Sequence, residues 1–182
     1  MKRAFIDTNI LVYAADQSSP TNRKTRIARE LLLQRGLHLS VQVLNEFTVN
    51  ARNRKKLNLS VAEEYDWIQR WLLFPIQAMT AESFLEARLF HECYQVNHWD
   101  GLILAAAKEA HCQTLYSEDL QSGQSYDGIT VVTHSYKQSP VSRKELMLVT
   151  IGFFQNSANH ERVIPLFESL QKSLQFQQTS EP

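Results

Sequence analysis

The sequence predicts a three-layer α/β/α domain in which a parallel sheet is covered by helices on both faces. Short apolar segments typical of buried strands alternate with amphipathic segments of ten or more residues, and this alternation favours a parallel sheet. The chain has 182 residues, 43% of them hydrophobic, and no long Pro, Gly or Ser tract. It can therefore bury one compact core.

The first half of the expected pattern begins with a strand over residues 3–6, followed by a helical turn over TNILVYAA and a polar loop. A helix over KTRIARELLLQ stops at Gly36, which is a suitable C-cap, and the strand LHLS follows. Two amphipathic helices, VQVLNEFTVNARNRKK and SVAEEYDWIQRWLL, come next. Ser60 with Glu63 three residues later predicts a capping box at the start of the second.

The second half begins with a short strand around PIQAM. A helix from Thr80 to about Val96 follows, and then a helix over WDGLILAAAKEAH. The strands QTLYS and ITVVT complete the alternation.

The net charge is zero, but the charge is unevenly distributed, with basic residues concentrated between residues 19 and 56. Most of these side chains are expected on solvated helix faces. The run RNRKK is the exception, because it forms a basic corner directly after an apolar helix and suits contacts with phosphate. The predicted RNA-binding residues are Arg52, Arg54, Lys55 and Lys56.

The N-terminus has no apolar segment long enough for a signal peptide, and the sequence has no 18-residue apolar run. We therefore expect a cytoplasmic protein with no membrane segment. Cys93 and Cys112 lack the spacing of a zinc site and are expected to be free, buried thiols.

Asp7 directly follows the first apolar strand, where an unpaired carboxylate would be costly to bury. Other acids are expected at the same sheet edge, since ligands bind outside the carboxyl ends of parallel strands. Asp119 follows the strand QTLYS. Asp100 lies in the first turn of the helix before that strand. The helix rises about 18 Å and the strand, which runs antiparallel to it, returns about 20 Å, so Asp100 and Asp119 should lie at the same edge as Asp7. Glu46 lies early on its helix, with Val43 and Val49 placing it beside the buried stripe.

Singly, each acid has a structural explanation as a cap, a turn residue or a surface residue. Together the four would repel strongly, because two carboxylates about 4 Å apart repel by roughly 4 kcal/mol at an effective dielectric of 20. A cation should therefore lie among them. An all-oxygen cluster suits Mg²⁺ or Mn²⁺, with Thr8 and Asn9 as supporting donors. Beside a basic corner, such a cluster suits phosphodiester hydrolysis.

Four segments, FIDTNILVYAAD, VLNEF, HWDGLILAAA and LYSEDLQSG, resemble the PIN-domain ribonucleases, in particular the VapC-type toxins of bacterial toxin–antitoxin pairs. The similarity covers about residues 1–135. It implies a Mg²⁺- or Mn²⁺-dependent endoribonuclease on a five-stranded parallel sheet. The family's acids map to Asp7, Glu46, Asp100 and Asp119, and its Ser/Thr positions map to Thr8 and Ser117. The resemblance also implies a homodimer that acts on structured RNA such as tRNA and is inhibited by an antitoxin.

The sequence departs from the family pattern at two positions near the expected site. Glu118 directly precedes Asp119 and makes the fourth ligand ambiguous; Asp119 is preferred, because Ser117 matches the family's hydroxyl-x-Asp spacing. Gly101 replaces a better helix former after Asp100 and is expected to loosen that helix start by up to about 1 kcal/mol.

The largest departure is the C-terminal extension, which divides the chain into a nuclease domain over 1–138 and a helical extension over 139–182. Val163, Phe167, Leu170 and Leu174 lie on one helical stripe. We expect a helix that packs on the same chain and ends in a frayed tail. The alternative is a contact with a second copy or with the antitoxin.

Two other functions stay open at this point. An aspartyl-phosphate phosphotransferase is disfavoured. Such enzymes usually carry a second acid two residues after the first, where this chain has Asn9, and a lysine near the later acids, whereas no lysine neighbours Asp119. The alternative that we retain is a non-catalytic RNA- or protein-binding module on the same fold.

Overall fold

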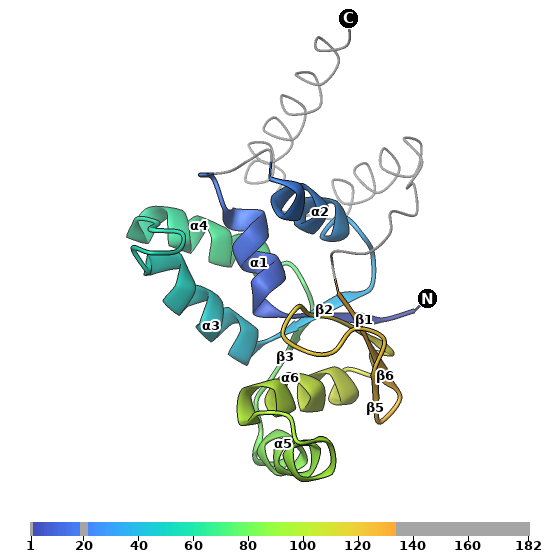
Figure 1. The fold of residues 1–182 in the computed structure, drawn as a ribbon. Coiled ribbons are helices and arrows are strands. Elements are labelled where there is room, and N and C mark those ends of the chain that lie inside the picture. Colours follow the sequence, from blue (N-terminus) through green and yellow to red (C-terminus); the bar gives the residue numbers. More distant parts are fainter. Residues whose placement is uncertain (1, 19–21, 134–182) are drawn as a thin grey trace, which may run out of the picture. The chain divides into compact units, whose positions relative to one another are not determined.

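The computed structural model describes residues 2–18 and 22–133, which form a three-layer α/β/α domain (Figure 1). The expectations for residues 139–182, including the helical stripe from Val163 to Leu174, lie outside the described residues. The division into two domains therefore stays a prediction. In the described ranges, no helix is long and apolar enough to cross a membrane.

The sheet has six strands in the order β3-β2-β1-β4-β6-β5. Its strands are β1 (Ala4–Ile6), β2 (Leu37–Ser40), β3 (Ile76–Gln77), β4 (Thr114–Tyr116), β5 (Ser125–Tyr126) and β6 (Ile129–Val132). Five of them are parallel, as predicted, and β5 adds an antiparallel edge beside β6. The α/β class is confirmed, with one short strand more than expected.

Six helices cover the sheet. They are α1 (Thr8–Ala15), α2 (Arg23–Leu31), α3 (Val41–Arg52), α4 (Val61–Trp71), α5 (Ala81–Tyr94) and α6 (His98–Glu109). Figure 1 shows α1, α2 and α4 on one side of the sheet and the packed pair α5 and α6 on the other. The core lies between these layers, where Phe5, Leu39 and Leu115 of neighbouring strands are fully buried.

Local sequence signals fix most helix starts. Ser60 and Glu63 form the predicted capping box of α4, and Thr80 caps α5. The predicted end of the second helix is wrong: α2 ends at Leu31, and Gly36, with φ of +80°, lies in the turn before β2. Of the apolar run LLL, Leu31 is buried in the core, and Leu32, directly after the helix, packs against it.

The register of the central strands brings two distant segments together. Ile6 of β1 pairs with Tyr116 of β4, and the Asp7 amide donates to the Tyr116 carbonyl at 3.0 Å. The residues directly after both strands, Asp7 and Ser117, therefore lie side by side at the carboxyl edge of the sheet. This edge is where ligands bind in parallel α/β sheets.

Candidate active site

The four acids predicted from the sequence line one open pocket of about 540 Å³. They come from four places in the fold: Asp7 from the end of β1, Glu46 from α3, Asp100 from the first turn of α6, and Asp119 from the loop after β4. Asn97, Trp99 and Ile103 complete the lining. The expected convergence is therefore present in the structure.

Asp7 is the most buried of the four acids, at 2% exposed, and it caps α1. Its carboxylate accepts hydrogen bonds from the Thr8 amide at 2.5 Å, the Ser117 hydroxyl at 2.5 Å and Asn9 Nδ2 at 3.1 Å. The pKa of Asp7 is raised to about 7, chiefly by burial and also by the charges of Asp119 and Glu46, while the hydrogen bonds from Ser117 and Thr8 oppose the rise.

Glu46 and Asp100 are each oriented by neutral side chains. The Thr8 hydroxyl donates to Glu46 Oε2 at 2.9 Å, and Gln42 Nε2 donates to Glu46 Oε1 at 2.8 Å. Asn97 caps α6 and donates through Nδ2 to Asp100 Oδ2 at 2.6 Å. Burial raises the pKa of Asp100, as do the negative charges of Asp119 and Glu46, while the bond from Asn97 lowers it. The acids therefore influence one another electrostatically.

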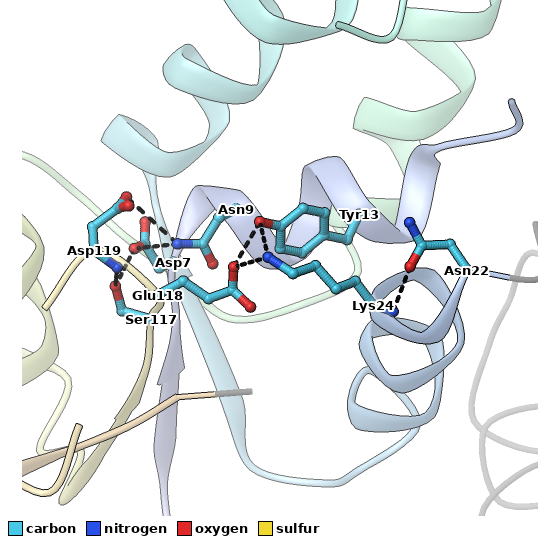
Figure 2. A network of polar contacts seen from close by, with 8 residues as sticks. All are labelled: Asp7, Asn9, Tyr13, Asn22, Lys24, Ser117, Glu118 and Asp119. Atoms are coloured by element: carbon cyan, nitrogen blue, oxygen red, sulfur yellow. Dashed lines mark hydrogen bonds and ion pairs between the residues drawn. The ribbon is translucent and has the colours of Figure 1, made fainter. Parts of the chain in front are cut away.

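Asn9 lies between two of the carboxylates, as Figure 2 shows. Its Nδ2 atom is 3.1 Å from Asp7 Oδ2 and 3.5 Å from Asp119 Oδ2. Its Oδ1 atom is buried and has no hydrogen-bond partner in the described part of the chain. Asn9 thus supplies a neutral donor to two neighbouring negative groups.

The chemistry of this donor set fits a hard divalent cation, because all four acids offer oxygen. Within residues 2–18 and 22–133, however, no group of three or more His, Cys, Asp or Glu side chains could hold a metal ion as arranged. The hydrogen bonds described above hold Asp7, Glu46 and Asp100 toward neighbouring donors instead. Asp119 is exposed and has the weakest restraint, so it is the acid most able to turn toward a cation.

Glu118 faces away from the pocket, although it is next to Asp119 (Figure 2). Its Oε2 atom is 2.6 Å from Lys24 Nζ and accepts from the Tyr13 hydroxyl at 2.7 Å. These contacts tie the loop after β4 to α1 and α2. The preference for Asp119 over Glu118 as a site residue agrees with this geometry.

Similarity to known proteins agrees with this geometry. The PIN domain family model matches residues 4–122, which is more than half of the chain. The chain belongs to the PIN-domain family. That family consists of nucleases. No curated protein matches the sequence significantly.

Three solved structures share the fold of this PIN domain. The VapC20 toxin of Mycobacterium tuberculosis, which cleaves the sarcin–ricin loop, is 15% identical with a TM-score of 0.52, over 64% of this chain and 89% of that one. A toxin–antitoxin complex from Klebsiella pneumoniae is 22% identical with a TM-score of 0.54, over 72% and 97%. VapBC2 of Rickettsia felis, bound to a promoter DNA fragment, is 19% identical with a TM-score of 0.50, over 70% and 96%. At these low identities, the TM-scores show similarity of fold alone.

The predicted basic corner lies outside the pocket lining of this PIN domain. Arg52 ends α3 and pairs with Glu64 at 3.6 Å, and Lys56 contacts the Asn50 side chain. Arg54 and Lys55 are exposed in the turn that follows. These side chains form a separate surface, so an RNA role for them stays a prediction.

Sequence reasoning missed Trp99, Asn97 and Gln42 at this site. HWD places an aromatic ring beside Asp100, and NHWD places a cap three residues before it, so the first two left a readable signal. Gln42 left none, since its contact with Trp99 joins α3 to α6 across the fold. The prediction that Val49 belongs to the buried stripe beside Glu46 is wrong. Val49 is 70% exposed, and the buried neighbours of Glu46 on α3 are Val43 and Phe47.

Proposed function

We propose that this PIN domain is a metal-dependent endoribonuclease and that it acts as the toxin of a toxin–antitoxin pair. The observation that carries the proposal is the convergence of Asp7, Glu46, Asp100 and Asp119 on one pocket. Perturbed pKa values such as those of Asp7 and Asp100 are typical of functional sites, and a cluster of carboxylate oxygens suits a hard divalent cation. The fold similarity to VapC toxins supports RNA as the substrate and an antitoxin as the partner.

In the proposed mechanism, Asp7, Asp100 and Asp119 would hold one or two Mg²⁺ or Mn²⁺ ions, and Glu46 would complete the set or orient the attacking water. The bound cation would lower the pKa of a water molecule and neutralise charge that develops on the phosphate. Thr8 fixes the Glu46 carboxylate, while Ser117 and Asn9 fix Asp7. Attack of water in line with the leaving oxygen gives a 5′-phosphate and a 3′-hydroxyl.

A cleavage assay with matched variants tests this proposal. Purified protein is incubated with tRNA and with other structured RNAs in Mg²⁺ or Mn²⁺, beside an EDTA control. We expect Asp7→Asn and Asp119→Asn to lower the rate at least 100-fold, because each removes a ligand charge. Asp66→Asn is the matched control, since Asp66 is exposed on α4 and outside the pocket.

The products and the metal requirement decide between the alternatives. A 2′,3′-cyclic phosphate end would exclude activated water as the nucleophile. RNA binding without cleavage in either metal would instead support the non-catalytic binding module. Growth arrest on expression, relieved by a protein encoded beside this chain, would identify the toxin role and the antitoxin. Sedimentation analysis checks the expected homodimer.

A further inference from the structure

Trp99 lies at the rim of the acidic pocket and is 61% exposed, although it belongs to the pocket lining. The other two tryptophans behave differently. Trp71 is 3% exposed, and Trp67 stacks on it with ring centroids 5.1 Å apart and planes at 20°. Packing against the core therefore explains Trp67 and Trp71 but does not explain Trp99.

The backbone of Trp99 is fixed relative to the acids. Gln42 is 3% exposed, and its Nε2 atom donates both to the Trp99 carbonyl at 3.1 Å and to Glu46 Oε1 at 2.8 Å. Trp99 also directly precedes Asp100 on α6. The backbone of Trp99 is thus fixed next to Asp100 and, through Gln42, relative to Glu46. A binding group whose backbone is held in this way is preorganised.

The rings beside Trp99 form an aromatic row that leads away from the pocket. The ring centroids of His98 and Trp99 are 5.8 Å apart, with the ring planes at 62°. The ring centroids of His98 and Phe84 of α5 are 5.3 Å apart, with the planes at 65°. Phe84 is 51% exposed. No ring in residues 2–18 or 22–133 stacks face to face on Trp99. Its indole is therefore available to a planar ligand.

We propose that Trp99 is a stacking platform for an unpaired nucleobase of the RNA, at a nucleotide next to the bond that is cleaved. This inference rests on the proposed function and specifies its substrate class. An exposed aromatic face is a common binding group for single-stranded RNA, because every base offers a planar face. A base inside a duplex is covered by its neighbours, so the site selects loops, bulges or single strands.

The test compares two RNA probes that differ only in their bases. The full chain carrying Asp7→Asn, which prevents cleavage, is titrated into labelled decauridylate and into an abasic ribose-phosphate decamer of the same charge. We expect Trp99→Ala to weaken binding to decauridylate about 5- to 100-fold. Binding to the abasic decamer should not change, because only the backbone contacts remain.

Two further variants separate stacking from a general structural effect. Trp99→Phe keeps an aromatic face and should retain most of the affinity for decauridylate. Leu89→Ala is the control, since Leu89 is 54% exposed on α5 and outside the pocket lining, and its affinity should equal that of the parent. Decauridylate should also quench the tryptophan fluorescence of the parent, and this quenching should be lost in Trp99→Phe.

Three results would overturn the inference. The first is an equal loss of affinity for both decamers in Trp99→Ala, which would indicate a structural role. The second is absence of any difference between Trp99→Ala and the parent with decauridylate. The third is unchanged RNA binding with an altered sedimentation coefficient, which would assign Trp99 to a protein interface.

The cleavage assay distinguishes this inference from the function beneath it. If the wild-type protein cleaves RNA and Trp99→Ala leaves KM and kcat unchanged, the stacking inference fails and the nuclease stands. If the wild-type protein cleaves nothing in either metal but base-dependent binding through Trp99 is seen, the nuclease fails and the stacking platform stands.

Discussion

At the scale of single residues, Asp7 shows how the site opposes stability. Its carboxyl is nearly fully buried, faces the charges of Asp119 and Glu46, and has a pKa of about 7. The hydrogen bonds from Thr8, Asn9 and Ser117 offset part of the burial cost, because they favour the charged form. A nearby cation would favour the ionised form of this carboxyl. Without a cation, its buried negative charge lowers the stability of the fold.

We predict that Asp7→Asn raises stability while abolishing cleavage. In the folded protein Asp7 titrates near pH 7, whereas in the unfolded chain it titrates near 3.8. From about pH 4 to about pH 7 the folded state therefore binds more protons, so the free energy of unfolding falls as the pH rises. The cost is complete above about pH 7, with a ceiling of about 4 kcal/mol for this shift.

Urea unfolding in EDTA checks this expectation. At about pH 8 Asp7→Asn should be about 1–3 kcal/mol more stable than the wild type, because the asparagine also loses part of the hydrogen bonding. The difference should vanish or reverse at about pH 4. Asp66→Asn should show no such pH dependence. A variant less stable than the wild type at about pH 8 would contradict the raised pKa.

Individual residues differed in how far the sequence revealed them. Asp7 and Asp119 were predictable, because Asp7 directly follows β1, Asp119 lies in the loop after β4, and parallel strands end at a common edge. Asp100 was predictable from the matched lengths of helix and strand. Gln42 was not, because its role depends on where α3 meets α6. Glu118 was ambiguous until Lys24 and Tyr13 were located.

At the scale of elements, the packing of α5 against α6 depends on Gly101. A Cβ atom at this position would lie 2.7 Å from the Ala87 carbonyl oxygen, which is closer than real contacts allow. The low helix propensity of glycine is therefore offset by the close approach of the two backbones. This approach also positions Asp100, which precedes Gly101 in the first turn of α6.

We predict that Gly101→Ala destabilises the protein, although alanine is the better helix former. The steric overlap should cost about 1–3 kcal/mol, because the atom that must move belongs to the backbone. Urea unfolding measures the change. Gln69→Ala on the exposed side of α4 serves as the control and should stay within about 0.5 kcal/mol of the wild type. A stabilised Gly101→Ala variant would show that the helices can separate at little cost.

Elements were predictable where a local pattern determines them. Apolar runs located the five parallel strands, and side-chain caps located the starts of α4 and α5. The edge strand β5 has two residues, too few for any periodicity, and it forms only because β6 offers a free edge. The end of α2 was misplaced because apolar residues continue past Leu31 into the turn, so neither the apolar run nor Gly36 marks the last helical residue.

At the scale of the whole molecule, a net charge of zero conceals a separation of charge. The pocket concentrates acids, and the turn after α3 concentrates basic residues. RNA would approach an acidic centre, so attraction has to come from another surface. Arg54, Lys55 and Lys56 are the exposed candidates, whereas Arg52 is paired with Glu64.

We predict that replacing Arg54, Lys55 and Lys56 together by alanine weakens RNA binding without changing kcat. The slope of log affinity against log salt should become shallower by about 0.7 for each phosphate of single-stranded RNA that is no longer neutralised. Binding titrations from about 50 to 200 mM salt measure it. Replacement of Arg23, Arg26 and Arg35 by alanine is the matched control, because it removes the same charge from an exposed surface. If both triple variants gave the same slope of log affinity against log salt, the basic corner would not be a specific part of the RNA interface.

The strand order has a consequence for synthesis of the protein. β4 is made late but lies in the sheet directly beside β1, so Asp7 receives the Ser117 hydroxyl only after most of the chain has been translated. A chain that ended before residue 114 would contain Asp7, Glu46 and Asp100 but not Asp119. It would also lack β4, the strand that pairs with one side of β1. The four-acid pocket therefore forms only after β4 and the loop that follows it have been made.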